Sequence, residues 1–181
     1  KYDAVVTGSL IIKENDCFYN RLIWMRQDGT FEQYDKRHLF SLANEDDQFT
    51  PGNRKFYIDL HGWKICPAIC YDLRFPELYR AMGLCDLLVV PAAFTYTTGQ
   101  AHWEILLRAR AIENQCFVLA AAQGGKHVTG RRTWGHSMLV DPLGEVLIQK
   151  PEGEGVVMGE LDLAQLASVR ASLPALQHRR L

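Results

Sequence analysis

Short apolar blocks separated by polar turns fill the first 70 residues of the chain. The blocks are rich in β-branched and aromatic side chains, a composition that is typical of β-strands. They predict strands at residues 4–12, 20–25, 31–34, 56–60 and 63–70. Asn, Asp and Gly residues stand between several of these blocks, so we expect antiparallel strands that follow one another closely along the chain.

The periodicity changes after residue 70. Apolar residues recur at helical spacing over residues 103–114, and Pro76 suits the first turn of a helix at 76–82. Asp162 is placed to cap a helix at residues 163–172. Further apolar blocks predict strands at residues 86–91, 117–122, 137–141, 145–149 and 155–161. Strands interleaved with helices indicate an α/β fold, and the length suits a single domain over residues 1–181.

The composition argues against several kinds of partner. The chain carries 20 Lys and Arg against 21 Asp and Glu, a formal net charge of −1. Binding to nucleic acid or to a membrane surface needs a basic field, which this balance does not supply. No apolar stretch approaches the roughly 20 residues that span a bilayer. We therefore expect neither a nucleic-acid nor a membrane partner.

The cysteines point to a reducing environment. There are five, an odd number, and most lie inside apolar runs. This pattern is unlike a secreted disulfide framework and predicts reduced thiols in a cytoplasmic protein. No CxxC pair and no nearby pair of histidines offers zinc-ligand spacing, and we expect neither a metal nor a cofactor.

Cys70 is the first candidate for chemistry. It ends the strand predicted at 63–70, and open α/β sheets bind ligands at the carboxyl edge of their strands. A cysteine nucleophile needs a base or a cation beside it. The sequence places none of the six histidines against Cys70, and Lys36, at a predicted strand end, is a second candidate. On residue type alone, an inert buried thiol and a solvated lysine are the commoner interpretations.

A resemblance changes this balance. Several stretches, in order, resemble motifs of the nitrilase superfamily, the carbon–nitrogen hydrolases: residues 34–40 (YDKRHLF), 69–76 (ICYDLRFP), 108–114 (RARAIEN), 135–137 (GHS) and 141–144 (DPLG). The similarity extends over residues 4–161. Residues 1 to about 77 look closest to bacterial omega-amidases, and the remainder looks closer to deaminated glutathione amidases. Both act on ω-amides of 2-oxo acids.

The resemblance implies a fold and a mechanism. The family folds as a four-layer α-β-β-α sandwich and uses a Glu, a Lys and a Cys. Cys70 would attack the amide carbonyl and form a thioester with release of ammonia, and water would then cleave the thioester. Lys36 and the backbone N–H of Tyr71 would stabilise the oxyanion. The segment 94–100 resembles a substrate-facing loop of the family, with Phe94 and Thr95 as substrate-binding residues.

Two further segments are left with alternatives. Glu45 matches a second carboxylate of several family members, which would position substrate or hold Lys36 by an ion pair; a solvated acidic loop is the equally weighted alternative. The basic run at residues 124–132 would meet a substrate carboxylate, or it is simply an exposed flexible loop.

The family's general base, a Glu, lies on a segment that precedes anything matching Ala4. We therefore expect an N-terminally incomplete nitrilase-like sandwich that hydrolyses little amide by itself and that forms a homo-oligomer. One alternative is a catalytically incomplete scaffold or oligomer subunit. Another is a Cys-His hydrolase, which requires His102 or His136 beside Cys70.

Overall fold

The computed structural model describes residues 3–54 and 56–180. Residues 1, 2, 55 and 181 of the predicted domain lie outside the described residues. The first strands, β1 (Val6–Glu14), β2 (Cys17–Met25) and β3 (Phe31–Asp35), form an antiparallel sheet in the order β1-β2-β3. We call it the small sheet.

A larger sheet contains most of the remaining strands. Its order is β11-β10-β7-β6-β5-β4. The strands are β4 (Ile58–Leu60), β5 (Trp63–Pro67), β6 (Leu87–Val89), β7 (Phe117–Ala120), β10 (Ser137–Val140) and β11 (Val146–Lys150). β5, β6 and β7 are parallel neighbours, whereas β4, β10 and β11 pair antiparallel at the two sides.

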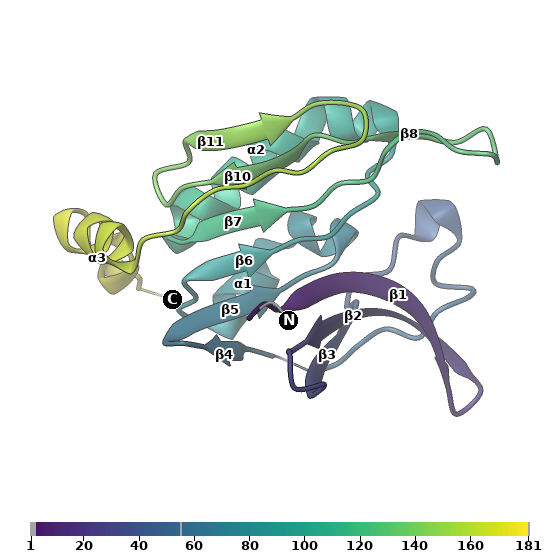
Figure 1. The fold of residues 1–181 in the computed structure, drawn as a ribbon, viewed down its shortest axis with the longest axis horizontal. Helices are drawn as coiled ribbons and strands as arrows, with labels where there is room; N and C mark the ends of the chain where they lie inside the picture. Colours follow the sequence, from purple (N-terminus) through teal and green to yellow (C-terminus); the bar gives the residue numbers. More distant parts are fainter. Residues whose placement is uncertain (1–2, 55, 181) are drawn as a thin grey trace.

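The large sheet is covered on both faces (Figure 1). Helices α1 (Pro76–Met82) and α2 (Tyr96–Asn114) pack on one face, and the small sheet packs on the other. Successive side chains of the central strands point to opposite faces of the sheet and pack into two cores. Leu88 and Val118 belong to the helix-side core, whereas Leu87 and Phe117 belong to the core between the sheets. Strands buried on both faces read as continuous apolar runs for this reason. The described residues thus supply an α-β-β arrangement.

The parallel strands give the molecule two distinct ends. Helix α3 (Leu163–Ser172) closes the end where the strands begin, because Arg170 donates to the Asp86 carboxylate at 2.8 Å and to the Cys85 carbonyl at 2.6 Å, just before β6. The segments that follow β5, β6 and β7 emerge at the opposite end (Figure 1). This carboxyl end is where α/β sheets bind ligands.

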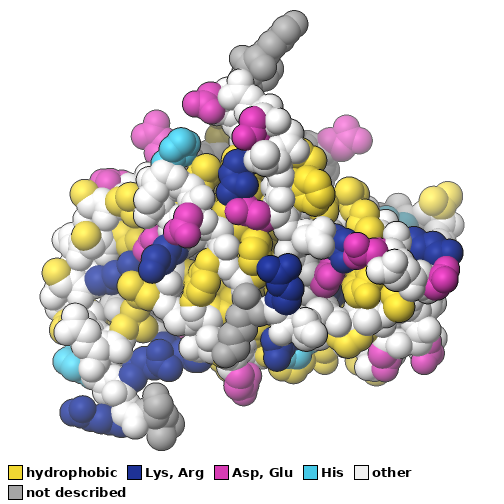
Figure 2. Space-filling view, turned by 90° about the horizontal axis from the view of Figure 1, so that it is seen from below, with side chains coloured by type: hydrophobic (Ala, Val, Ile, Leu, Met, Phe, Trp, Pro, Cys, Tyr) yellow, Lys and Arg dark blue, Asp and Glu magenta, His cyan; other side chains and the backbone are white. Residues whose placement is uncertain are grey.

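The surface carries mixed charge. Figure 2 shows Lys and Arg side chains interspersed with Asp and Glu on the face seen from below, with hydrophobic side chains between them. Neither sign of charge forms a continuous field on that face. Among the residues that the structure describes, no helix is both long enough and apolar enough to cross a membrane.

Several predicted elements are confirmed with shifted bounds. The strand predicted at 63–70 ends at Pro67, and Cys70 instead opens the 3-10 helix η2 (Cys70–Arg74). The helix predicted from residue 103 begins at Tyr96, so most of the loop expected at 94–100 is helical. Its first turn is polar, and Thr, Gly and Gln residues there hid the helical period from the sequence.

The remaining corrections concern backbone pairing. Residues 155–161 form no strand, although the segment is apolar. Gly159 in this segment packs against the side chain of Leu139. The basic run expected to be a flexible loop forms a hairpin of β8 (Gly124–Lys126) and β9 (Arg132–Trp134). Polar, glycine-rich strands lack the alternation on which strand prediction depends.

Candidate active site

Cys70 sits at a tight backbone turn. Its φ is +49°, in the left-handed region that non-glycine residues rarely adopt. The turn is held on the β6 side by the bond from the Cys70 N–H to the Pro91 carbonyl at 3.0 Å. Such a conformation costs of order 1–3 kcal/mol and persists only where surrounding contacts enforce it. The turn lifts the thiol out of the sheet and toward the open carboxyl end.

Asp72 lies two residues beyond Cys70 and contacts this turn. It is fully buried, and its carboxylate accepts hydrogen bonds from the Ile69 N–H (3.1 Å) and the Tyr34 hydroxyl (2.8 Å). It also accepts from the backbone N–H of His38 (2.9 Å) and lies 2.8 Å from its Nδ1. Tyr34 and His38 flank Lys36 in sequence. One buried carboxylate therefore ties the cysteine turn to the segment that carries the lysine.

Lys36 follows directly after β3 and is only 3% exposed. Its ammonium is paired with the Glu45 carboxylate. Glu45 also accepts from the Asn20 side-chain amide at 3.0 Å and from the Phe40 backbone N–H at 2.7 Å. The acidic residue is thus held by a lysine, an amide and a backbone donor, and its ion pair with Lys36 is one of the two roles expected from the sequence.

Burial and neighbouring charges act in opposite directions on these groups. Burial raises the pKa of the Cys70 thiol, and the nearby Lys36 ammonium opposes that rise. Burial also opposes ionisation of Glu45, but its contacts with Lys36, Phe40 and Asn20 outweigh it and lower the pKa of that carboxyl. The surroundings therefore favour the ionised form of Glu45 and the protonated form of Cys70.

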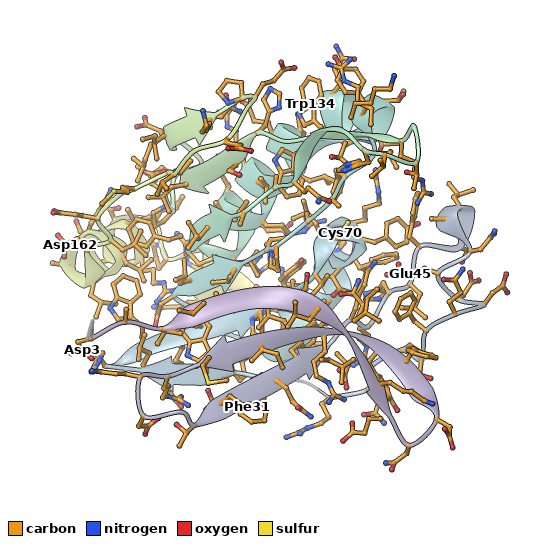
Figure 3. The ribbon with its side chains drawn as sticks, turned by 45° about the vertical axis from the view of Figure 1, so that its right-hand side comes forward. Asp3, Phe31, Glu45, Cys70, Trp134 and Asp162 are labelled. Carbon is orange, nitrogen blue, oxygen red and sulfur yellow. The ribbon has the colours of Figure 1, made fainter. Side chains whose placement is uncertain are left out.

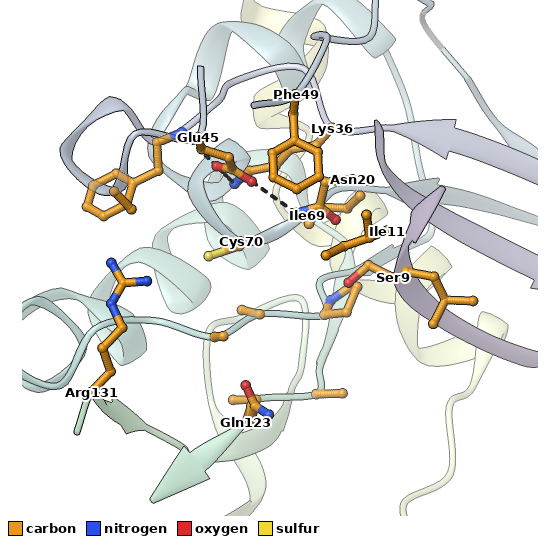
Figure 4. Close-up of a pocket in the computed structure, with 18 of the residues that line it drawn as sticks. Ser9, Ile11, Asn20, Lys36, Glu45, Phe49, Ile69, Cys70, Gln123 and Arg131 are labelled. Atoms are coloured by element: carbon orange, nitrogen blue, oxygen red, sulfur yellow. Dashed lines mark hydrogen bonds and ion pairs between the residues drawn. The ribbon is translucent and has the colours of Figure 1, made fainter. Parts of the chain in front are cut away.

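These residues share one open cavity of about 800 Å³. Figure 3 places Cys70 and Glu45 at the same end of the molecule, away from Asp162 beside α3. In the close-up of Figure 4, the Cys70 sulfur lies between the Lys36–Glu45 pair on one side and the Arg131 and Gln123 side chains on the other. The cavity has room for a small organic substrate.

The predicted substrate-binding residues lie together beside Cys70. Tyr71, Phe94 and Thr95 line a side pocket of only about 40 Å³ that also reaches Cys70. The Tyr71 ring contacts the Phe40 ring with centroids 4.9 Å apart, and Phe94 packs on the buried Trp103 at 4.8 Å. The pocket is largely filled by its own aromatic walls, so it suits a small group.

The histidines stand apart from the thiol. His102 Nδ1 lies 3.1 Å from an Arg74 guanidinium nitrogen. His136 stacks on Trp134 with ring centroids 4.0 Å apart, and its Nδ1 lies 2.9 Å from the Trp134 carbonyl oxygen. No histidine in the described part of the chain lines the Cys70 cavity. The geometry therefore does not support a Cys-His pair.

The sequence alone missed several contributors. Asn20 enters the site because β2 pairs with β3, so that its carbonyl accepts from the Lys36 N–H at 2.9 Å. Asp72 belongs to the motif at residues 69–76, but nothing in the sequence indicated its contacts with Tyr34 and His38. Within the described ranges, 3–54 and 56–180, no group of three or more His, Cys, Asp or Glu is placed to hold a metal ion.

The chain is similar to known proteins. The family model described as carbon-nitrogen hydrolase matches residues 1–171. A deaminated glutathione amidase from Bos taurus is 53% identical over 173 residues, which covers 90% of this chain and 53% of that protein.

Two solved structures extend the comparison. A CN-hydrolase superfamily protein from Xanthomonas campestris, with an arsenic adduct in its active site, has a TM-score of 0.93 and 35% identity, covering 99% of this chain and 70% of that one. A variant of an amidase from Nesterenkonia sp. AN1 carries the acetamide moiety of fluoroacetamide on its active-site cysteine. It has a TM-score of 0.82 and 26% identity, covering 98% and 65% of the two chains.

The chain spans about half the length of the curated relatives that it matches. The described lining residues of the Cys70 cavity fall between Ser9 and Ser137, within the matched region.

Proposed function

Because this chain belongs to the carbon–nitrogen hydrolase family, we propose that it contributes the nucleophile and oxyanion site of an amidase. The observation that carries the proposal is the convergence of Cys70, Lys36 and Glu45 on one open cavity. A thiol at a strained turn beside a buried cation is an arrangement suited to acyl transfer.

In the proposed reaction the Cys70 sulfur attacks the amide carbonyl carbon. A C–S bond forms, and the carbonyl oxygen becomes an oxyanion that accepts from Lys36 Nζ and from the Tyr71 backbone N–H. Collapse of this intermediate breaks the C–N bond, the base passes the proton that it took from the thiol to the departing nitrogen, the amine or ammonia leaves, and a thioester remains. Water then adds to the thioester, which releases the carboxylic acid and restores the thiol.

Glu45 acts in this proposal as a positioning residue. Its lowered pKa and its ion pair with Lys36 make it a weak proton acceptor, so it fixes the ammonium rather than taking the thiol proton. The raised pKa of Cys70 means that a separate base must remove that proton during attack.

The proposed substrate is the ω-amide of a small 2-oxo acid. The name of the similar relatives favours deaminated glutathione, and 2-oxoglutaramate is the alternative. The two differ in leaving group. Deaminated glutathione releases cysteinylglycine, because its scissile nitrogen belongs to cysteine, whereas the primary amide 2-oxoglutaramate releases ammonia.

The setting of this site is also a proposal. We take residues 1–181 as one carbon–nitrogen hydrolase domain and expect it to self-associate, since Val6, Leu10 and Phe31 of the small sheet leave apolar side chains exposed. The five free cysteines favour a reducing, cytoplasmic compartment.

The test offers both substrates to the protein and follows both products. Hydroxylamine added during turnover should capture the thioester as a hydroxamate, and Cys70→Ser should abolish capture. Cys17→Ser, which alters a half-exposed cysteine outside the cavity, is the matched control. Capture that persists in Cys70→Ser, or that is lost equally in Cys17→Ser, would overturn the proposal.

A further inference from the structure

We propose that Arg131 binds a carboxylate on the leaving portion of the substrate and thereby selects an extended amide over a primary one. This inference rests on the proposed amidase function and deepens it. It assigns a role to the basic run at residues 124–132, which the catalytic residues leave unexplained.

The first argument is the shape of the cavity. A second cavity of about 570 Å³ adjoins the one at Cys70. The two share lining residues, Phe40, Ala43, Ala93, Gln123 and Arg131, so they form one continuous space. Arg131 therefore stands where the catalytic cavity opens into this side chamber, and Figure 4 shows its guanidinium extending from the hairpin toward the region of Cys70.

The second argument is charge. The side chamber is lined by Arg131, Arg132 and His127, and none of its described lining residues is Asp or Glu. Arg132 is already engaged, with its guanidinium 3.7 Å from the centroid of the Tyr96 ring and 3.5 Å from the Glu152 carboxylate. Within the described residues, Arg131 makes no ion pair. A guanidinium facing a chamber without anions is suited to a carboxylate ligand, which it can bind in bidentate geometry.

The third argument is length. In deaminated glutathione two residues, Cys and Gly, separate the scissile nitrogen from the terminal carboxylate, a reach of at most about 7 Å. The pocket at Tyr71 and Phe94 is about 40 Å³ and cannot take a dipeptide, whereas the 570 Å³ chamber can. 2-Oxoglutaramate has only hydrogens on its amide nitrogen, so it has no carboxylate on the leaving side for Arg131 to bind.

The hairpin gives Arg131 a defined position. The His127 N–H donates to the Arg131 carbonyl at 2.8 Å, and Gly130 has a φ of +81°, which glycine adopts without strain. Lys126 lies on the same hairpin and lines a different surface hollow, so it serves as a matched control for the loss of a positive charge.

The experiment measures binding without turnover. In a Cys70→Ala background, isothermal titration compares deaminated glutathione with its C-terminal glycinamide analogue. The analogue keeps the 2-oxo carboxylate and lacks only the C-terminal one. We expect the acid to bind about tenfold more tightly than the amide, as for a partly solvated charged hydrogen bond. Adding Arg131→Met should reduce this ratio to about one, and adding Lys126→Met should preserve it.

The outcomes separate the inference from the function on which it rests. Equal binding of acid and amide before substitution, or a ratio that survives Arg131→Met, would overturn the role of Arg131 and leave the amidase proposal intact. If neither ligand binds while 2-oxoglutaramate does, the extended substrate itself is wrong, and the inference fails with it.

Discussion

Replacing Asp72 with Asn tests the link that holds the cysteine turn to the lysine segment. The side chain keeps its size, but one carboxylate oxygen becomes an amide NH₂ that cannot accept a hydrogen bond. One carboxylate oxygen accepts from the Tyr34 hydroxyl and the Ile69 N–H. The other accepts from the backbone N–H of His38 and contacts Nδ1 of the same residue. Whichever way the amide turns, its NH₂ faces one backbone N–H, that of Ile69 or that of His38, and the hydrogen bond from that N–H is lost.

A buried backbone N–H left without its acceptor costs about 1–3 kcal/mol, so we expect Asp72→Asn to lower the free energy of unfolding by that amount. Urea denaturation followed by circular dichroism should show a lower midpoint with an unchanged m-value, because the folded state stays compact. A total stability of 5–15 kcal/mol leaves the variant folded enough to measure.

The matched control is Asp59→Asn on the exposed side of β4, for which we expect a change within about 0.5 kcal/mol. Tyr34→Phe removes one neutral donor and leaves the other three contacts of the Asp72 carboxylate in place, so it should cost less than Asp72→Asn. A loss below about 1 kcal/mol for Asp72→Asn, or one equal to that of Asp59→Asn, would refute the view that this carboxylate enforces the turn.

The remaining predictions concern the charge pair and one close packing contact. Burial raises the pKa of Cys70, Lys36 opposes the rise and Glu45 adds to it. Lys36→Met should therefore raise the pH midpoint of Cys70 alkylation by iodoacetamide, and Glu45→Gln should lower it. Shifts in the same direction for both variants would contradict this electrostatic account. A Cβ at Gly99 would lie 2.2 Å from that of Trp134, so Gly99→Ala should lower the free energy of unfolding by about 1–3 kcal/mol. Gly8→Ala, with open space around it, should change it by less than about 1 kcal/mol in the same denaturation assay.

Much of the fold followed from local patterns. The hairpin around residues 137–149, the helix beginning at Pro76 and the Asp162 cap were all predicted and are present, with Asp162 accepting from the Ala164 N–H at 2.7 Å. Periodicity, proline and capping residues act over a few neighbouring positions, so their signal survives without tertiary context.

The failures share a different cause. A polar first turn concealed the start of α2, and the glycine-rich β8–β9 hairpin carries no alternation. The segment 155–161 looked like a strand because it is apolar, but among the described residues it pairs with no neighbouring strand. A strand exists only where another backbone completes its hydrogen bonds, and no local pattern supplies that partner.

The candidate site divides in the same way. The sequence by itself determined that Cys70, Lys36 and Glu45 are candidate active-site residues, since each lies in or near a motif that resembles one family. Only the tertiary structure decided that Glu45 pairs with Lys36 and that Asp72 contacts the turn of Cys70. It also decided that Arg131, 61 residues after Cys70 in the sequence, lines the same cavity as Cys70. These relations depend on which strand ends meet at the carboxyl edge of the large sheet, and long-range packing rather than local preference sets that order.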